Sequence, residues 1–218
     1  MEVEQLIFRV DLHIKRILNT PIASNCFVLH LPNFKDCIII DPGSKDNSAL
    51  IAYLNKNELT PTIVILTHEH FDHIWGVISL SNYYKFKLIC NKICANAIVD
   101  SKKNLSIFYD NVGFSILNKV STVEMLNHEL SWNGKHFKLL QTPGHSEGSI
   151  CIQLEDVIFC GDLLIQNEKT VTKLPGGSLA RLKETVENLK SNLSPETLIH
   201  SGHGDSFLFK NYYIFSEL

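Results

Sequence analysis

Four side chains that can bind a metal ion lie within six consecutive residues: His68, His70, Asp72 and His73. Imidazole nitrogen and carboxylate oxygen are ligands that zinc and iron prefer in proteins. In an extended segment, residues two apart share a face, so His68 and His70 can bind one ion together. A turn after His70 would direct Asp72 and His73 toward a second ion. The motif HxHxDH arises by chance in roughly one such sequence in a thousand, so it indicates a metal site.

Three further candidate ligands each follow an apolar run typical of a β-strand and lie beside a glycine. Glycine lets the backbone approach a metal closely, and loops at strand ends are where folds place reactive groups. Any one of these residues alone is better explained as a turn or capping residue. Together with the motif at 68–73, they favour one shared metal site. The three residues are His145, Asp162 and His203.

Asp41 and the remaining histidines have simpler explanations. Asp41 ends an apolar run immediately before Pro42 and Gly43. From this spacing alone, Asp41 either begins a turn or orients a histidine that binds metal. Structural roles are expected for the histidines that lack any partner pattern, which are His13, His30, His128, His136 and His200.

Strand-like and helix-like segments alternate along the chain and place the candidate ligands at strand ends. Apolar, β-branched runs predict strands at 26–29, 37–40, 62–66, 87–90, 137–140, 150–152, 157–159 and 197–199. Apolar residues three and four apart predict helices at 46–55, 74–84, 91–100 and 179–193. The segment 101–121 is polar and mixed, and it receives no assignment. Two mixed halves of this kind favour sheets packed against each other with helices outside.

The composition is that of an ordinary globular protein, and it argues against several classes. The chain has 218 residues, 44% of them hydrophobic, and a formal net charge of -3. We expect a single domain spanning 1–218. The near-neutral balance argues against a nucleic-acid partner, which would require a basic excess. No apolar run approaches the ~18–20 residues of a membrane span, so no membrane partner is expected. The oligomeric state stays open.

The start of the chain and the cysteines both favour a reducing compartment. Glu2 and Glu4 make the start acidic where a secretory signal would be basic, so we expect a cytoplasmic location. Six cysteines are scattered through apolar segments without the spacing of a zinc knuckle. We therefore expect buried hydrophobic side chains rather than disulfides or metal ligands.

As an ordered set, these motifs resemble those of the metallo-β-lactamase superfamily, and specifically its glyoxalase II-like hydrolases. The resemblance covers nearly the whole chain. It implies an α/β fold, the αββα sandwich of two mixed β-sheets flanked by helices, with metals bound at one edge between the sheets. The matching segments are 25–28, 40–43, 68–73, 142–149, 159–164 and 202–204.

The resemblance also implies a role for each candidate ligand in a site for two divalent ions. It favours Asp41 as a residue that orients a ligand histidine. Zinc is the expected metal, although iron and manganese also suit a His/Asp site. The implied ligands are His68, His70 and His145 for the first ion, Asp72, His73 and His203 for the second, and Asp162 for both.

Such a site would support hydrolysis of a small acyl substrate. A divalent metal lowers the pKa of its bound water toward ~7, so hydroxide exists at neutral pH and can attack a carbonyl carbon. The metals also stabilise the charge that develops on the oxygen. Asp72 is the expected catalytic residue, because it can hold the hydroxide by hydrogen bonding. The loaded site would carry a charge of about +1, which favours an anionic small-molecule substrate.

The sequence departs from the glyoxalase II pattern in two places that concern glutathione. The 15 residues after His203 are too few for the helical domain that helps those enzymes bind glutathione. Lys173 falls near the position of a glutathione-binding lysine in that family, but by itself it is better explained as a loop residue. A glutathione thioester is therefore one candidate substrate among several acyl compounds.

Five alternatives share the same motifs. Persulfide dioxygenases use this fold with a single iron, whose ligands here would be His68, His145 and Asp162. A lactonase would need the same hydroxide. A non-catalytic binding module is disfavoured, because relatives that lose their chemistry usually lose ligands. A nuclease is disfavoured by the lack of a basic stripe, and a β-lactamase by the expected cytoplasmic location and by Asp72.

Overall fold

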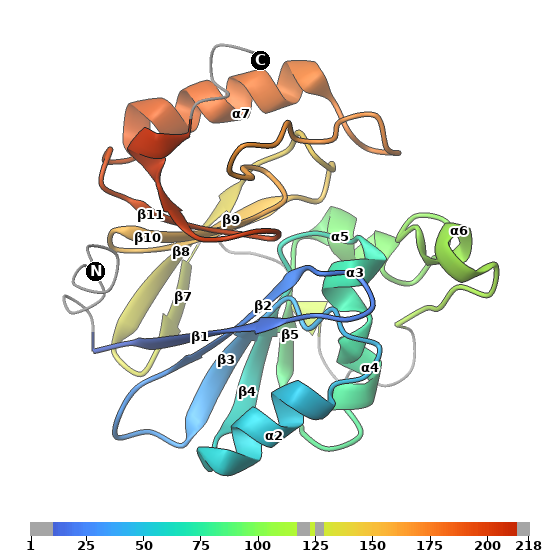
Figure 1. Ribbon diagram of the computed structural model, residues 1–218, viewed down its shortest axis with the longest axis vertical. Helices are drawn as coiled ribbons and strands as arrows, with labels where there is room; N and C mark the ends of the chain where they lie inside the picture. Colours follow the sequence, from blue (N-terminus) through green and yellow to red (C-terminus); the bar gives the residue numbers. More distant parts are fainter. Residues whose placement is uncertain (1–10, 117–122, 125–128, 213–218) are drawn as a thin grey trace.

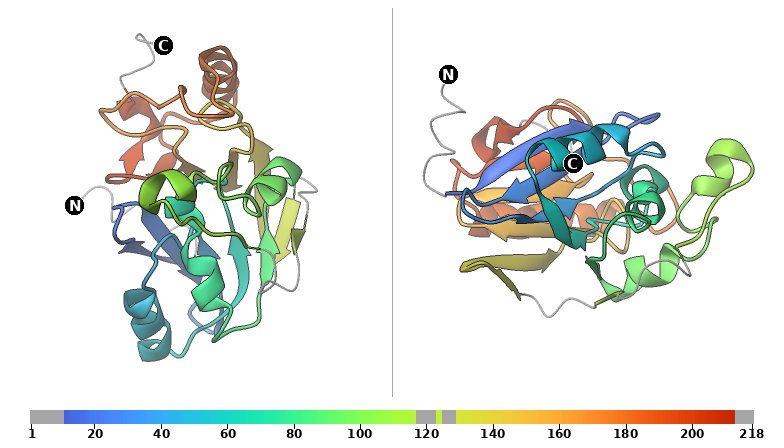
Figure 2. Two further views of the ribbon diagram at one scale, coloured as in Figure 1. Left: turned by 90° about the vertical axis from the view of Figure 1, so that its right-hand side faces the viewer. Right: turned by 90° about the horizontal axis from the view of Figure 1, so that it is seen from below.

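Two six-stranded sheets pack face to face in the computed structural model, and helices cover their outer faces (Figure 1). The structure describes residues 11–116, 123–124 and 129–212. Views turned by 90° show the same layers, with α6 (Ser106–Asp110) projecting beyond them (Figure 2). The expected αββα sandwich is therefore confirmed.

The first sheet comes from the first half of the chain and has the order β1-β2-β3-β4-β5-β6. Its first three strands are antiparallel, and from β3 onward neighbouring strands are parallel. The strands are β1 (His13–Leu18), β2 (Asn25–His30), β3 (Asp36–Ile40), β4 (Thr60–Ile65), β5 (Lys87–Ile89) and β6 (Val123–Glu124). The helices of this half, besides α6, are α2 (Ser48–Lys56), α3 (Phe71–Ile74), α4 (Gly76–Leu80) and α5 (Lys92–Ala97).

The second sheet comes from the second half and has the order β12-β11-β10-β9-β8-β7. Only β10 and β11 are parallel, and α7 is the crossover between them. The strands are β7 (Glu129–Trp132), β8 (Lys135–Gln141), β9 (Ile150–Leu154), β10 (Val157–Gly161), β11 (Leu198–Ser201) and β12 (Phe207–Leu208). The helices are α7 (Leu179–Asn192) and a short 3-10 turn, η2 (Phe209–Asn211).

The central strands are buried on both faces, which explains their continuous apolar runs. In β2, Phe27 and Leu29 pack between the sheets against the second half, and Phe27 lies 5.1 Å from Phe159 between ring centroids. The alternate residues, Cys26 and Val28, pack under the helices. All six cysteines are buried and free of disulfides, as the sequence predicts.

Two predicted helices are wrong in their bounds: the helix expected at 91–100 ends three residues earlier, at Ala97, and the helix expected at 74–84 differs more. The segment 74–84 is replaced by α3 and α4, which together begin three residues earlier and end at Leu80. The helical hydrogen bonding is interrupted because the Gly76 N–H donates to the Pro42 carbonyl, at 2.7 Å, instead of to its own helix. The earlier start matters for the site, because α3 carries Asp72 and His73.

The elements that sequence patterns missed are short or lie at sheet edges. They include β1, β7 and β12, together with α6 inside the unassigned segment 101–121. Edge strands expose one side to solvent, so their sequences lack the continuous apolar run that marks a central strand. Residues 117–122 of the unassigned segment lie outside the described part of the chain. Among the described residues, no helix is long and apolar enough to cross a membrane.

Candidate metal centre

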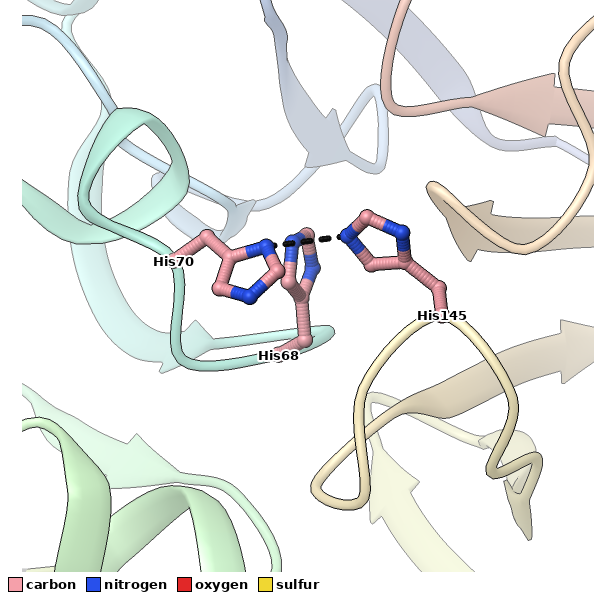
Figure 3. A group of neighbouring side chains, drawn as sticks. All are labelled: His68, His70 and His145. Carbon is pink, nitrogen blue, oxygen red and sulfur yellow. Dashed lines mark hydrogen bonds between the residues drawn. The ribbon is translucent and has the colours of Figure 1, made fainter. Parts of the chain in front are cut away.

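Loops that follow four strands meet at one edge of the sandwich. The loop after β4 carries His68 and His70, and the loop after β8 carries His145. These three side chains point toward one another from opposite halves of the molecule (Figure 3). Asp162 and His203 follow β10 and β11. The candidate ligands from both halves of the sequence thus converge between the two sheets.

The first group is formed by three buried histidines. One ring nitrogen from each of His68, His70 and His145 lies within 4.8 Å of the others. His145 Nε2 is 2.9 Å from His70 Nδ1, and the three rings stand nearly perpendicular to one another. Burial lowers the pKa of His70 to about 3 and also lowers the pKa values of His68 and His145. All three rings are therefore neutral at pH 7, which is the form that binds metal.

The second group contains a carboxylate and is more open to solvent. Asp72, His73 and His203 each offer one ligand atom within 4.8 Å of the others. Asp72 Oδ2 lies 3.3 Å from His203 Nε2 and 3.6 Å from His73 Nε2. The His73 side chain is fully buried, whereas those of Asp72 and His203 are 14% and 26% exposed. Solvent and substrate can therefore reach the site from this side.

Asp162 lies between the two groups. Its Oδ2 is 3.6 Å from His145 Nε2 in the first group and 3.5 Å from His203 Nε2 in the second. Its Oδ1 is 3.3 Å from His73 Nε2. The carboxylate approaches this closely because Gly202 has no side chain, since a Cβ there would lie 2.1 Å from Asp162 Oδ1. Asp162 thus faces both sets of ligands.

Protein groups orient four of the five histidines through Nδ1, which leaves Nε2 directed into the site. Carbonyl oxygens can only accept, so the tautomers of His145 and His203 follow from their partners. The Thr67 hydroxyl donates to Asp41 and can therefore accept from His68. The Nδ1 partners are Thr67 Oγ1 for His68 (3.0 Å), Asp41 Oδ2 for His73 (3.0 Å), the Val171 carbonyl for His145 (2.9 Å) and the Ala23 carbonyl for His203 (3.1 Å).

The residues present fit divalent metal ions. Nε2 of His68 and Nε2 of His70 are buried and have no hydrogen-bond partner among the described residues. A buried polar atom without a partner is costly in a folded protein, and a cation would satisfy both. Imidazole and carboxylate are also the donor types that zinc, iron and manganese accept.

The carboxylates of the site also stabilise positive charge on the neighbouring histidines. Burial opposes the charged form of His203, but the carboxylates of Asp162 and Asp72 outweigh burial and raise its pKa to about 9. The same two carboxylates hold the pKa of His73 well above its usual value against the effect of burial. Burial likewise opposes ionisation of Asp162, but His73 and His203 keep its pKa well below the usual range. The carboxylates therefore attract protons that bound cations could replace.

Asp41 contacts the site through hydrogen bonds to its neighbours. Its Oδ1 accepts from the Thr67 N–H at 2.8 Å, and its Oδ2 accepts from the Thr67 hydroxyl at 2.6 Å and from His73 Nδ1. It also sits in a turn, with a positive φ of 52°. The two interpretations that spacing left open for Asp41 are therefore compatible. Asp41 lies in the turn, and it also orients His73.

Glu69 is a residue that sequence reasoning missed. Its side chain is buried, and its Oε2 accepts from the Ser146 hydroxyl at 3.0 Å. Burial raises its pKa above the usual value. The hydrogen bond joins the loop that carries His68 and His70 to the loop that carries His145. The only feature of the sequence that pointed to Glu69 is its position between two candidate ligands. Its hydrogen-bond partner, Ser146, lies 77 positions away.

Lys173 is not brought into the site by any contact. Its side chain is exposed, and it makes no hydrogen bond or ion pair with a residue that the structure describes. The same loop does contribute to the site through its backbone, because the Val171 carbonyl orients His145.

Comparisons with known proteins match this geometry to one family. The family model for the metallo-beta-lactamase superfamily matches residues 19–203. The chain belongs to this superfamily. A solved superfamily structure, the BLEG-1 B3 metallo-beta-lactamase, is 28% identical, with a TM-score of 0.86 over 94% of this chain and 100% of that one.

Curated relatives with functional names include hydrolases of two kinds. One is the probable metallo-hydrolase YqgX of Bacillus subtilis, 28% identical over 84% of this chain and 86% of the relative. The other is the hydroxyacylglutathione hydrolase of Buchnera aphidicola, 30% identical over 78% of this chain but only 58% of the relative. These comparisons support a metal-dependent hydrolase, with the reaction left to be established.

Replacing Asp41 by asparagine should weaken metal binding by about 10- to 100-fold, which is the usual effect of removing a group that orients a ligand histidine. The amide has nearly the same volume but keeps only one acceptor oxygen, whereas three groups now donate to the two carboxylate oxygens, so its NH2 group would face at least one donor. A chelator competition titration with zinc measures the change. The control is Asp36→Asn, at the other end of β3, whose carboxylate accepts from Trp132 Nε1. Equal zinc affinities in the two variants would contradict the assigned role.

Proposed function

We propose that the chain is a dinuclear metal-dependent hydrolase that acts on a thioester or a related small acyl compound. The observation that carries this proposal is the position of Asp162 between two groups of ligand atoms. A site for a single ion would not require the second group. The similarity to a hydroxyacylglutathione hydrolase adds support for a thioester.

Each group would hold one ion. His68, His70 and His145 would bind the first, and Asp162 would contact both. The second ion would take Asp72, His73 and His203. Zinc is the metal we propose, and iron and manganese are the alternatives that the same donors accept.

The bound ions supply a water of lowered pKa and polarise a carbonyl oxygen. The protein's own contribution is to position the reacting groups. Asp72 is partly exposed, so its carboxylate can accept a hydrogen bond from the attacking water and orient it. Hydrolysis joins the water oxygen to the acyl carbon, breaks the carbon–sulfur bond and releases the thiol. The fixed Nδ1 partners of the histidines keep this arrangement preorganised.

The first experiment is elemental analysis of purified protein for zinc, iron and manganese, followed by a substrate panel. The panel contains S-lactoylglutathione, thioesters of other thiols, a lactone and a β-lactam. About two ions per chain with thioester hydrolysis would support the proposal. Hydrolysis of only the lactone or the β-lactam would replace the proposed substrate class.

The main competing function is oxidation by a single iron. A preparation with one iron per chain that consumes oxygen in the presence of glutathione persulfide would overturn the hydrolase proposal. Purified protein that binds none of the three metals would overturn both functions. The same assays therefore separate the two enzyme classes.

A further inference from the structure

Three aromatic side chains form a continuous surface beside the metal centre, which we call the aromatic shelf: Phe71, Trp75 and Tyr109. The ring centroid of Tyr109 lies 5.0 Å from that of Phe71 and 5.6 Å from that of Trp75, and the rings of Phe71 and Trp75 are 5.6 Å apart. Each ring therefore contacts both others. Tyr109 is 44% exposed, and Phe71 and Trp75 are half-buried, so the shelf is open to solvent.

The shelf is attached directly to the candidate ligands. Phe71 stands between His70 and Asp72 in the chain, and Trp75 follows one turn later, at the end of α3. Asp72 is on the solvent-exposed side of the centre. A substrate that reaches the centre past Asp72 therefore passes the shelf.

Tyr109 belongs to the segment 104–114, which contains α6 and which we call the α6 lobe. Buried polar groups hold this lobe in place. The Asn104 carbonyl accepts from the Phe71 N–H at 2.9 Å, which ties the lobe to the end of the ligand loop. The Asn104 side chain donates to the Phe114 carbonyl, and Ser106 Oγ accepts from the Phe114 N–H. Phe114 in turn stacks on Trp75 at 5.4 Å. The exposure of Tyr109 is thus a feature of an ordered lobe.

Charge near the shelf matches an anionic substrate. Lys45 Nζ lies 5.0 Å from the centroid of the Trp75 ring. A loaded metal centre is also expected to carry net positive charge.

We infer that the shelf binds the acyl group of the substrate and selects an aromatic one, so that the substrate class is an anionic thioester of an aryl-containing acid. This inference rests on the proposed function. Aromatic rings gain most from contact with other rings in edge-to-face or offset geometry. The shelf presents such rings beside the candidate ligands, since Phe71 lies between His70 and Asp72 in the chain, whereas a short acyl group would leave them in water.

The kinetic test compares two thioesters with the same leaving group, S-acetylglutathione and S-phenylacetylglutathione, on the metal-loaded protein. We expect kcat/KM to be about tenfold higher for the phenylacetyl compound. Tyr109→Ala should reduce this ratio by about 3- to 10-fold, and Tyr109→Phe should retain it because the ring remains. The matched control is Phe108→Ala, the neighbouring residue of α6, which is 72% exposed.

A binding measurement tests the shelf without relying on turnover. The chain has two tryptophans, so Trp132→Phe leaves Trp75 as the single fluorescent reporter in the shelf. Phenylacetate should change this fluorescence at a lower concentration than acetate, and Tyr109→Ala should weaken the phenylacetate response.

The outcomes separate the two proposals. A protein that hydrolyses both thioesters with equal kcat/KM, and whose Trp75 does not distinguish the two acids, overturns the shelf but leaves the hydrolase. A protein that hydrolyses no thioester but binds phenylacetate at Trp75 in a Tyr109-dependent way overturns the thioesterase and supports the shelf as an aryl-binding surface. If Phe108→Ala reduced the ratio of the two kcat/KM values as much as Tyr109→Ala does, the assignment of acyl-group selectivity to Tyr109 would be wrong.

Discussion

Asp162→Ala is expected to abolish both metal binding and hydrolysis. The carboxylate approaches histidines of both groups, at 3.6 Å from His145 and 3.5 Å from His203. Its removal takes away a shared ligand and one negative charge, so neither ion retains its full set of donors. After dialysis against zinc and removal of free ion, elemental analysis should fall from about two ions per chain to a small fraction of that value.

The control for this variant is Asp156→Ala, an exposed aspartate in the turn between β9 and β10. It should keep the metal content and activity of the unmodified protein. Circular dichroism shows whether Asp162→Ala is still folded, and Asp162→Asn repeats the test with the side-chain volume retained. A folded variant at position 162 that keeps both its metal and its hydrolysis would refute the bridging role.

Gly43→Ala is expected to cause the largest loss of stability among simple substitutions near the site. A Cβ at this position would lie 1.6 Å from the backbone carbonyl oxygen of Asp72 and 2.7 Å from Asn19 Nδ2. Because the first of these atoms is backbone, it cannot rotate away, and the start of α3 must move. We expect the free energy of unfolding to fall by about 3 kcal/mol or more. Metal affinity should fall as well, because α3 carries Asp72 and His73.

Urea unfolding measures this effect, read as a change in the midpoint at constant slope. Gly134→Ala provides a contrast, because a Cβ there meets nothing within 4 Å but must adopt a φ of +76°. That variant should lose only about 1 kcal/mol, from backbone strain alone. If Gly43→Ala unfolds at the same urea concentration as Gly134→Ala, the close packing of the 41–43 turn on α3 is not a significant source of stability.

The sandwich was predictable because its central strands and α7 follow strong local patterns. Strands buried on both faces produce continuous apolar runs, and α7 repeats apolar residues such as Leu182, Val186 and Leu189 on one buried face. The helix predicted at 74–84 has the wrong bounds because of a contact that cannot be recognised in the local sequence. Its hydrogen bonding is broken by the Pro42 carbonyl, which comes from a turn more than thirty residues earlier.

The candidate ligands were visible as residue types, and their grouping was partly visible as well. The spacing of His68 and His70, followed by a turn before Asp72 and His73, predicted two sets of ligands, and the structure brings His68 and His70 together with His145, and Asp72 and His73 together with His203. Spacing could not decide the role of Asp41, because its partners Thr67 and His73 are 26 and 32 residues away.

By itself, the sequence determined the donor chemistry, the positions of those donors at strand ends, and the sheet-forming core, since all three depend on residue type and short-range periodicity. Only the tertiary structure decided which surfaces surround the donors. Glu69 meets Ser146, the Val171 carbonyl meets His145, and the α6 lobe places Tyr109 on Phe71. These contacts join residues that are far apart in the chain, and the contact between Glu69 and Ser146 forms only when the two halves pack together.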